Sequence, residues 1–492
     1  MVKVEKKSMN KFTDKRVLVV GCARSGTGAA NLLSFLGARV TITDRRPAEM
    51  LKAHLKGLKS SITVVTGEIP VELFESAELI VISPGVPLTI PEIISAMAAG
   101  VAVIGELELA YQVVMLAADR PANSRAVGVF GSETPPPHFT GITGTNGKST
   151  VTTLVDLMYG AAGFNSLLGG NIGNALTEEI LKCGKKTDLQ GLDYIVAEIS
   201  SFQLETISEF APFIAAILNI TPDHMDRYVS LQDYINAKFR IFEKQTKDGY
   251  LVLNADDQVL MKAFQEIRDD SSGPQVFFFS RQHEVKGVFV RDGLVYCSLP
   301  QLEVSELPLI ALSEIRIKGV HNLENAMAAA LIALLSGCPY QAIRDVLMSF
   351  SGLEHRLEYA GEVNGVQYIN DSKGTNTGAV AMSLQSFSGP VVLIMGGSDK
   401  DSDFGVLKDV IGEKVSRLIL LGEAAGKIKK ALGDAVEMVV VGSLREAVLE
   451  AASQTIPGDT VLLSPACASF DMFVDFEDRG RQFKKIVKEL AN

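Results

Sequence analysis

The sequence is poor in cysteine, and its few cysteines form no recognisable pattern. Five occur in 492 residues, an odd number, and no two of them make a Cys-x-x-Cys pair. They are Cys22, Cys183, Cys297, Cys338 and Cys467. This spacing gives neither a disulfide framework nor a cysteine metal site. We therefore expect reduced, small buried residues of the kind found in cytoplasmic proteins.

Long apolar runs are also missing. Residues 326–335, AMAAALIALL, supply only about half of the ~20 apolar residues that a membrane span needs. The charged stretch MVKVEKKSMNKF at the start is not followed by an apolar segment of the signal-peptide type. We therefore expect no membrane insertion and a cytoplasmic location.

Positive charge is scarcer than negative charge. The chain has 47 Lys and Arg against 58 Asp and Glu, which gives a formal net charge of −11, and the basic residues are scattered. This balance argues against a nucleic-acid-binding surface. An anionic substrate must therefore be attracted by local groups, because the field of the whole protein repels it.

The length is too great for a single core and suggests about three domains. We predict an α/β protein with a Rossmann-like N-terminal domain (1–116), a central P-loop ATPase-type domain with a mostly parallel sheet (139–352) and a C-terminal Rossmann-like domain (353–492). Residues 117–138 show no sustained periodicity and contain three consecutive prolines. We interpret them as a linker or mobile surface loop between the first two domains.

Runs of apolar and β-branched residues predict the strands of these domains. The predicted strands are 16–20, 39–43, 79–82, 194–199, 214–220, 250–254, 391–395, 418–421, 436–441 and 460–463. A hairpin is predicted at 288–296, around an Asp-Gly pair. A helix is predicted at 322–336, before a Gly and a Pro that would stop it.

The strongest chemical signal is the stretch FTGITGTNGKSTVTTL, which reads as a strand, a glycine-rich turn and a helix that begins at Lys148. Gly144 and Gly147 allow positive φ, so several N–H groups and a helix N-terminus can converge on one anion. Lys148 adds a charge, and Ser149 adds a hydroxyl suited to Mg²⁺. The match to G-x-x-x-x-G-K-[ST] is imperfect, because Ile142 stands at the first glycine. The simpler alternative is a turn that merely needs glycines.

The first strand leads into a turn that imitates a dinucleotide-binding fingerprint. Gly21 to Gly28 follow residues 16–20, and the second strand ends at Asp44, but Ala23 stands where the second glycine belongs. The strand 79–82 ends in a Ser-Pro-Gly turn at the sheet edge where ligands of open α/β sheets bind. The alternative is that both loops contain these residues only because the residues favour tight turns, and that neither loop binds a ligand.

Three polar residues follow strands of the central domain or lie on the helix after them. Glu198 ends one strand, His224 follows the next, and Lys238 lies in the helix YINAKFRIFE. A carboxylate at a strand end beside a phosphate loop commonly orders Mg²⁺. The simpler readings are a loop hydrogen bond for His224 and a solvated helix lysine for Lys238.

Several motifs occur together and in order along the chain. They are GTNGKST, EISSFQLE, NITPDHMDRY, GVHNLENAMAA, LEHRLE, NDSKGTNTGA, GGSDKDSDF and LSPACASFDMF. This combination is very similar to the bacterial Mur ligases, and SSFQLE with the last motif resembles the branch that adds D-glutamate. The likeness covers nearly the whole chain, except that residues 117–138 look longer than the usual connection of the family.

The resemblance implies a monomeric, cytoplasmic ligase of peptidoglycan precursor synthesis, with UDP-N-acetylmuramoyl-L-alanine and D-glutamate as substrates. The γ-phosphate of ATP would pass to the substrate carboxylate, which has no leaving group of its own. The amine of D-glutamate would then attack the acyl phosphate, and the tetrahedral intermediate would release phosphate and leave an amide. Two Mg²⁺ ions would neutralise the phosphates.

The resemblance also implies the residues of the ATP site. They are Gly144, Thr145, Asn146, Gly147, Lys148, Ser149, Thr150, Asn322, Asn325, His355, Arg356, Asp371 and Lys373. Lys148, Glu198, His224 and Lys238 form the implied catalytic set. One Mg²⁺ would be held by Ser149 and Glu198, and the second would lie near His224 and Lys238. Because an ammonium cannot ligate Mg²⁺, the family pattern suggests that Lys238 is a carbamate formed with CO₂.

The other two sites follow from the same resemblance. The positions implied for the UDP substrate are Arg24, Ser25, Asp44, Arg45, Arg46, Ser83, Pro84, Gly85 and Asn171. Those implied for D-glutamate are Thr375, Lys400, Ser469 and Phe476. Arg356 and Lys373 lie at the start of the third domain, so domain closure would complete the ATP site.

Three other functions account for part of the sequence. The N-terminal fingerprint alone would suit a dinucleotide-dependent oxidoreductase, which leaves the phosphate loop unexplained. A folylpolyglutamate synthetase or another Mur-type ligase shares GTNGK and amide-forming chemistry, but the first domain and SPACASFDMF disfavour it. A third alternative is a P-loop protein that uses ATP only as a switch for partner binding.

Overall fold

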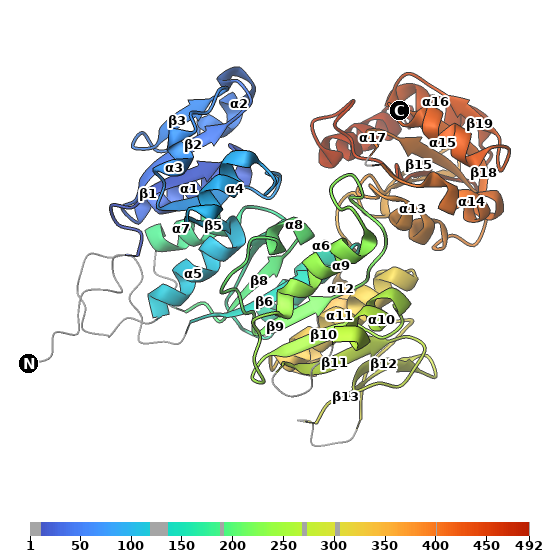
Figure 1. Cartoon of the computed structure of the whole chain (residues 1–492). Helices are drawn as coiled ribbons and strands as arrows, with labels where there is room; N and C mark the ends of the chain where they lie inside the picture. The colour runs from blue at the N-terminus through green and yellow to red at the C-terminus, as the bar shows by residue number, and fades with distance from the viewer. Residues whose placement is uncertain are drawn as a thin grey trace, which may run out of the picture.

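The computed structural model describes residues 11–118, 136–186, 191–267, 273–300, 306–399 and 401–491. Three β-sheets follow one another along the chain, and helices cover each of them. In Figure 1 the N-terminal part (blue) and the C-terminal part (red) lie above the central part, on opposite sides of it. This arrangement confirms the predicted α/β class with three layered units.

The N-terminal sheet has five parallel strands in the order β3-β2-β1-β4-β5. Its elements are β1 (Arg16–Val20), α1 (Arg24–Phe35), β2 (Arg39–Asp44), α2 (Ala48–Leu55), β3 (Thr63–Thr66), α3 (Glu72–Glu75), β4 (Leu79–Ile82), α4 (Pro91–Ala98), β5 (Ala102–Gly105) and α5 (Glu106–Ala118). The strand order reverses between β1 and β4. The turns that follow these two strands therefore flank the crevice where such sheets bind ligands.

The central sheet has nine strands in the order β14-β13-β12-β11-β10-β9-β6-β8-β7. Its strands are β6 (His138–Thr143), β7 (Ser166–Gly170), β8 (Tyr194–Glu198), β9 (Ile214–Ile217), β10 (Tyr250–Asn254), β11 (Gln275–Ser280), β12 (Gly287–Arg291), β13 (Leu294–Ser298) and β14 (Leu307–Ala311). Only β13 and β14 pair with their neighbours in antiparallel fashion. The strand that leads into the phosphate loop, β6, is thus enclosed between two parallel neighbours, β8 and β9.

The helices of the central part cover both faces of its sheet. They are α6 (Lys148–Ala161), α7 (Leu176–Lys186), α8 (Ser201–Leu204), α9 (Leu231–Phe239), the 3₁₀ helix η2 (Arg240–Phe242), α10 (Gln258–Ile267), α11 (Val320–Leu335) and α12 (Tyr340–Ser349). The apolar run of α11 packs with α6 in one buried cluster. Among the described residues, no helix is long and apolar enough to cross a membrane.

The C-terminal sheet has six strands in the order β15-β16-β20-β17-β18-β19. Its elements are β15 (Glu358–Val363), β16 (Val366–Asn370), α13 (Thr377–Leu384), β17 (Val391–Gly396), η3 (Phe404–Leu407), α14 (Lys408–Lys414), β18 (Val415–Leu421), α15 (Ala425–Leu432), β19 (Met438–Val440), α16 (Leu444–Gln454), β20 (Thr460–Leu463) and α17 (Phe476–Leu490). All pairs except β15 with β16 are parallel. The loops after β16 and β20 therefore lie side by side.

One apolar core joins the N-terminal and central parts. The ring of Tyr111 on α5 packs edge-on against Phe139 on β6 and Phe210, each at 5.3 Å between ring centroids. The buried carboxylate of Glu108 accepts backbone N–H bonds from residues 208, 209 and 210 at 2.9–3.1 Å. Helix α5 thus fixes the first sheet on the second.

Several predicted strand bounds differ from the structure, by three residues at one end in β9 and in β18 (Val415–Leu421), and one prediction is met closely. Strand β9 ends at Ile217, earlier than predicted, because Asn219 and Thr221 after it bond the phosphate loop and not a neighbouring strand. Strand β19 covers only Met438–Val440 at the sheet edge, where it pairs with β18 alone. The predicted hairpin is present as β12 and β13. Its turn holds Asp292 at φ 49° and Gly293 at φ 77°, as a type I′ turn requires.

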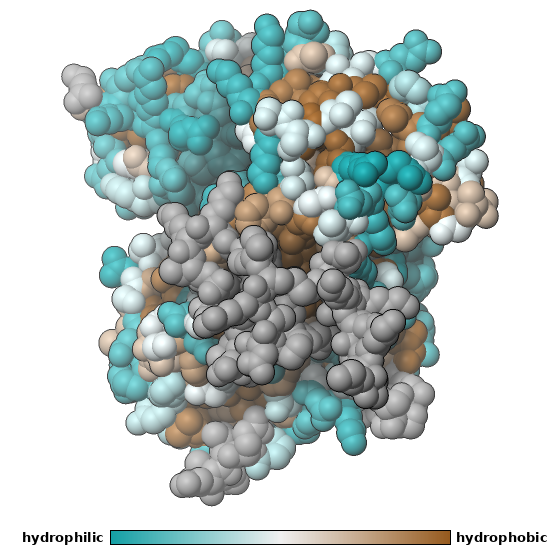
Figure 2. Space-filling view, turned by 90° about the vertical axis from the view of Figure 1, so that its left-hand side faces the viewer, coloured by the Kyte–Doolittle hydropathy of each residue, from teal (hydrophilic) through white to brown (hydrophobic). Residues whose placement is uncertain are grey.

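None of the five cysteines forms a disulfide, as predicted. Four of them are buried, and Cys183 is partly exposed. On the face of the molecule shown in Figure 2, apolar side chains form patches among hydrophilic ones. The predicted linker, 117–138, falls mostly outside the described residues.

Candidate active site

The phosphate loop has the predicted form of a strand, a tight turn and a helix. Gly144 has φ 150° and Gly147 has φ 86°, and α6 begins directly at Lys148. A Cβ at position 147 would also lie 2.2 Å from Oδ1 of Asn325 on α11. Glycine is therefore required there both by the backbone angle and by the close approach of a second helix.

The segment after β9 holds the loop in this shape. The side-chain amide of Asn219 accepts a bond from the N–H of Asn146 at 2.8 Å and donates one to its carbonyl at 3.1 Å. The N–H of Thr221 donates to Oγ1 of Thr145 at 3.0 Å. The loop is therefore preformed by protein contacts, and its N–H groups need no ligand to become ordered.

Lys148 lies inside the loop that it follows. Its Nζ donates to the carbonyls of Gly144 at 2.8 Å and Thr145 at 2.7 Å. Burial lowers the pKa of Lys148, whereas the charges of Glu198 and Asp223 act to raise it. A partly buried ammonium held by neutral carbonyls favours an incoming anion, which the phosphates of a nucleotide would supply.

Glu198 ends β8 beside the loop, since β8 pairs with β6 so that Glu198 lies opposite Ile142. The side chain is 3 % exposed, and Oε1 accepts a bond from Nδ2 of Asn171 at 2.9 Å. Within the described residues, the buried Oε2 has no hydrogen-bond partner. A buried carboxylate oxygen without a partner, at the strand end beside the phosphate loop, fits the donor set of a hard divalent cation.

Lys238 is not the solvated helix lysine of the simpler reading. It is 1 % exposed, its Nζ donates to the carbonyl of Gly144 at 2.9 Å, and the ring of Tyr234 lies 4.5 Å away. Burial and the charge of Lys148 lower its pKa well below the usual range, although Asp223 acts in the opposite direction. Its nitrogen therefore lies at the phosphate loop, where an ammonium would be poorly stabilised.

His224 lies in the turn after β9 with φ 58°. Its N–H donates to Oδ1 of Asp223 at 2.9 Å, and its ring packs edge-on against Phe202 at 4.7 Å. Sequence reasoning did not assign a role to Asp223, although its charge acts on both Lys148 and Lys238. The sequence did contain an indication of this role, because Asp223 is a carboxylate in the segment after β9, and Glu198 is a carboxylate at the end of the nearby strand β8.

The C-terminal part reaches the phosphate loop through Asn376, which sequence reasoning also missed. Oδ1 of Asn376 caps α13 by accepting a bond from the N–H of Ala379 at 2.8 Å. Its Nδ2 donates to Oδ2 of Asp223 at 3.0 Å and to Oδ1 of Asn146 at 3.4 Å. One amide thus ties a helix of the third sheet to the loop of the second.

The other residues predicted for ATP divide into two groups. Arg356 and Lys373 are close enough for their charges to lower the pKa of Lys148, and Asn325 touches Gly147. The side-chain amide of Asn322, on the first turn of α11, donates to the carbonyl of Lys318 at 2.8 Å. The remaining two, His355 and Asp371, are buried in the C-terminal part and bonded to its own residues.

The residues predicted for the UDP substrate surround the crevice of the first sheet. The Ser83 hydroxyl donates to the carbonyl of Gly21 at 3.1 Å, which joins the turns after β4 and β1. Arg24 and Ser25 open α1, and Arg24 donates to the carbonyl of Gly173 in the central part. The turn formed by Pro84 and Gly85 continues from Ser83.

Asp44 ends β2 and is bonded within its own unit. Burial acts to raise its pKa, but the Arg46 guanidinium and the N–H groups of Cys22 and Arg46 outweigh this and lower the pKa to about 2. Arg46 forms a 2.7 Å ion pair with Asp44, and Arg45 lies 3.4 Å from Glu92. Asp44 is therefore ionised and holds Arg46 in place.

The residues predicted for D-glutamate lie on neighbouring loops. The Lys373 ammonium lies 5.1 Å above the ring of Phe476, and Ser469 is buried in the loop after β20. Thr375 bonds the carbonyl of Lys373 through its N–H at 2.9 Å. The fourth residue, Lys400, lies outside the described residues.

A buried arginine that sequence reasoning missed joins these two loops. Nε of Arg479 donates to Oγ of Ser372 at 3.0 Å, and Nη2 donates to the carbonyl of Cys467 at 3.2 Å. Burial lowers the pKa of Arg479 to about 10. The sequence offered one indication of this contact, because Arg479 lies on the first turn of α17, three residues after Phe476.

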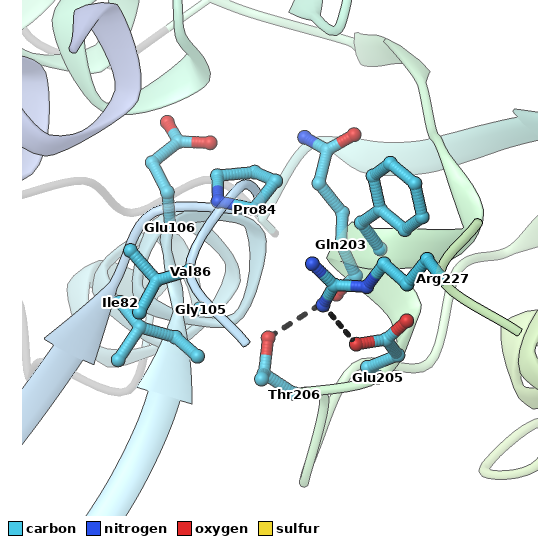
Figure 3. A pocket seen from close by; sticks show the side chains of 10 residues that line it. Ile82, Pro84, Val86, Gly105, Glu106, Gln203, Glu205, Thr206 and Arg227 are labelled. Atoms are coloured by element: carbon cyan, nitrogen blue, oxygen red, sulfur yellow. Dashed lines mark hydrogen bonds and ion pairs between the residues drawn. The ribbon is translucent and has the colours of Figure 1, made fainter. Parts of the chain in front are cut away.

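A pocket lies where the first sheet meets the second. Figure 3 shows Glu106 and Pro84 on one side and Gln203 and Arg227 on the other. Arg227 forms a 2.5 Å ion pair with Glu205 and lies 4.5 Å over the ring of Phe202. The complete lining is Ile82, Pro84, Val86, Gly105, Glu106, Phe202, Gln203, Glu205, Thr206 and Arg227.

Comparisons with known proteins agree over nearly the whole chain. Family models match in three places: "Mur ligase MurD-like, N-terminal domain" at 15–105, "Mur ligase middle domain" at 142–333 and "Mur ligase, glutamate ligase domain" at 355–467. The UDP-N-acetylmuramoylalanine–D-glutamate ligase of Trichlorobacter lovleyi is 42 % identical over 97 % of this chain and 99 % of its own length. The ligase of the same name from Koribacter versatilis is 41 % identical over 97 % and 98 %.

Solved structures support the fold. The MurF ligase of Thermotoga maritima in complex with ADP matches with a TM-score of 0.58 at 14 % identity, and covers 99 % of this chain and 100 % of that one. The UDP-N-acetylmuramate-alanine ligase MurC of the same organism has a TM-score of 0.58 at 17 % identity, over 96 % and 99 %.

Proposed function

The chain belongs to the Mur ligase family, and from this membership we propose how its three sheets share one amide-forming reaction. The chain adds D-glutamate to UDP-N-acetylmuramoylalanine in an ATP-dependent step of peptidoglycan synthesis. In the proposed division, the first sheet binds the UDP part, the second binds ATP and the reacting carboxylate, and the third binds D-glutamate. We expect the reaction to take place in the cytoplasm, with a monomeric enzyme.

The phosphate loop is the proposed site for the β- and γ-phosphates of ATP. The start of α6 and the Lys148 ammonium both favour an anion at this point. Asn325 and Arg356 have buried nitrogen atoms without a partner among the described residues, so they can still bind the rest of the nucleotide. Asn322, His355, Asp371 and Lys373 complete the proposed set.

The free oxygen of Glu198 and the hydroxyl of Ser149 are the proposed ligands of one Mg²⁺, which would neutralise phosphate charge when bound. His224 and Lys238 are the proposed residues of a second. We propose that Lys238 forms a carbamate: its neutral amine adds to CO₂, a C–N bond forms, and one proton is released. This change replaces a poorly stabilised cation at the loop with an oxygen anion.

The reaction then balances without a further reactant. The carboxylate of the UDP substrate takes the γ-phosphoryl group of ATP and releases ADP. The amine of D-glutamate attacks the acyl carbon, phosphate leaves with the bridging oxygen, and the amine loses a proton. The contact of Asn376 with Asp223 and Asn146 keeps the C-terminal part against the loop, which shelters the acyl phosphate from water.

The preformed phosphate loop beside the free Glu198 oxygen is the observation that carries this proposal. The test is phosphate release by the full chain with ATP and Mg²⁺. We expect release only when UDP-N-acetylmuramoyl-L-alanine and D-glutamate are both present, together with formation of the amide. Release that needs neither substrate would instead indicate an ATP-driven switch. Release with a folate substrate would indicate the synthetase alternative.

The D-glutamate site gives a more selective prediction. Replacing Lys400 with alanine is expected to raise the KM for D-glutamate by about tenfold or more, because a charge-assisted bond to a substrate carboxylate is lost. The KM for ATP should change little. Steady-state kinetics with each substrate varied in turn measures both values.

The matched control is Lys430→Ala. Lys430 is exposed in the last turn of α15. Its loss removes one positive charge from the C-terminal part and leaves intact the ion pairs of Lys427 with Asp399 and Asp401, the neighbours of Lys400. Equal increases in the KM for D-glutamate and for ATP in the Lys400 variant would count against the assignment.

A further inference from the structure

Buried polar atoms without a partner mark the proposed ligand sites of this chain. Among the described residues they include Oε2 of Glu198 and Oγ1 of Thr143 at the phosphate loop, and the nitrogens of Asn325 and Arg356 nearby. Such atoms are costly to bury, so each needs an explanation. Two further carboxylate oxygens of this kind, Oε2 of Glu106 and Oδ1 of Asp471, lie outside the sites described so far, and that of Glu106 is next to residues proposed for the UDP substrate.

Glu106 is the first residue of α5 and is 1 % exposed. Its Oε1 accepts two bonds from Thr177 at the start of α7, from the N–H at 2.7 Å and from the hydroxyl at 2.8 Å. Its Oε2 has no partner in the described part of the chain. The junction of α5 and α7 thus accounts for Oε1, which holds Thr177, but it gives no hydrogen-bond partner to Oε2.

The surroundings of Glu106 are shared with the proposed UDP-substrate residues. The segment 171–177 is held at three points: Asn171 bonds Glu198, the Gly173 carbonyl accepts a bond from Arg24, and Thr177 bonds Glu106. Burial raises the pKa of the Glu106 carboxyl, whereas the bonds from Thr177 and the charge of Arg24 act to lower it. Glu106 therefore contacts the segment that carries Asn171 and feels the charge of Arg24, and both of these residues are proposed for the UDP substrate.

Glu106 also lines the pocket shown in Figure 3, together with Pro84 in the turn proposed for the UDP part. Phe202 lines the same pocket, and its ring packs against that of His224 at 4.7 Å between ring centroids. The pocket therefore brings Glu106 together with one residue of the proposed UDP site and with a neighbour of the proposed catalytic set.

We propose that Glu106 is a specificity-determining residue: its Oε2 accepts a hydrogen bond from a hydroxyl or amide N–H of the N-acetylmuramoyl-alanine half of the substrate. This inference rests on the proposed function. It explains why a carboxylate, with two acceptor oxygens, stands where one acceptor would suffice to hold Thr177. The proposed hydrogen bond would also add to the binding free energy of the whole substrate, and UDP alone could not form it.

The test is Glu106→Gln in the full chain. The glutamine carbonyl can still accept both bonds from Thr177, while its NH₂ group replaces the acceptor Oε2 with a donor that opposes the substrate's donor. The control is Thr177→Val, which weakens the helix junction and leaves the carboxylate intact. Calorimetric Kd values are measured for UDP-N-acetylmuramoyl-L-alanine and for UDP alone, with thermal unfolding of each variant.

We expect Glu106→Gln to weaken binding of the whole substrate by about tenfold or more, because a buried acceptor is replaced by a mismatched donor. Binding of UDP alone should stay unchanged in both variants, and Thr177→Val should bind the whole substrate as the wild type does. Equal binding by Glu106→Gln and wild type would overturn the proposal. An equal loss for UDP and the whole substrate, or a similar loss in Thr177→Val, would also overturn it.

A second variant keeps the proposal testable if the Glu106→Gln protein does not fold. Glu106→Asp keeps the charge but is shorter by one methylene, so it cannot reach Thr177 and the substrate together. It should lose affinity for the whole substrate and not for UDP, and unchanged affinity for both would overturn the proposal. Wild-type product formation is measured in parallel. Its absence would contradict the proposed function itself, whereas a normal wild type with unaffected variants would contradict only the role of Glu106.

Discussion

Lys238→Ala is expected to abolish ligation while the chain remains folded. The lysine nitrogen lies at the phosphate loop, where it is buried and donates a hydrogen bond to the Gly144 carbonyl. If it carries a carbamate, its loss removes a metal-binding anion from the reacting phosphates, and turnover should fall by roughly 10³-fold or more. Initial rates of amide formation measure this, and circular dichroism checks the fold.

Controls for this variant separate chemistry from packing. Lys244→Ala removes an exposed lysine that pairs with Glu243 at 3.1 Å and should keep wild-type rates. Lys238→Met fills the buried volume without a nitrogen and should be as inactive as the alanine variant. A small carboxylic acid such as acetate should restore part of the Lys238→Ala activity, because it places an oxygen anion in the vacated space. Wild-type activity in Lys238→Met would contradict the carbamate.

The carbamate also has a direct signature. Wild-type protein supplied with isotopically labelled bicarbonate should show a carbamate carbonyl resonance that Lys238→Met lacks. A spectrum without any such difference between the two proteins would contradict the modification, whatever the kinetics show.

Glu198→Gln is expected to cause the second large loss. The glutamine carbonyl can keep the bond from Asn171, but its NH₂ group cannot ligate a cation where Oε2 now lies free. Turnover should fall by roughly 10²- to 10³-fold, and the Mg²⁺ concentration for half-maximal activity should rise. Rates measured across a Mg²⁺ titration give both quantities.

The matched control is Glu209→Gln. The Glu209 side chain is exposed and lies 3.7 Å from Lys11, and it is not among the residues proposed for the active site. It should leave both turnover and the Mg²⁺ requirement unchanged. A Glu198→Gln protein with an unaltered Mg²⁺ requirement would show that Glu198 is not a metal ligand.

Local signals predicted the framework of this structure well. The alternation of buried strands and amphipathic helices gave the three α/β units, and β1, β4, β10 and β20 begin and end where the sequence predicted. The phosphate loop was readable because its glycines, lysine and serine are adjacent in the chain. Glu198 was readable for a similar reason, since a carboxylate at the end of a buried strand lies at the sheet edge that binds ligands.

Contacts between distant segments were not readable from local patterns. Lys238 looked like a solvated lysine because periodicity on a short helix does not show which neighbour covers it, and here the loop backbone of Gly144 does. Asn376 reaches Asp223 only because the third sheet packs against the second. Glu106 is buried because α5 and α7, from different sheets, meet at Thr177. Such contacts depend on how the domains pack together, and the spacing of residues within one segment does not show this packing.

The central claim is that ATP activates the carboxylate of the UDP substrate as an acyl phosphate at the phosphate loop. Its most direct test is a single ligation reaction with an oxygen-isotope label in that carboxylate, followed by mass analysis of the released phosphate. We predict that the phosphate carries one labelled oxygen from the substrate, because the bridging oxygen leaves with it. Phosphate whose new oxygen comes only from solvent water would contradict the account, since ATP would then be hydrolysed without activating the carboxylate.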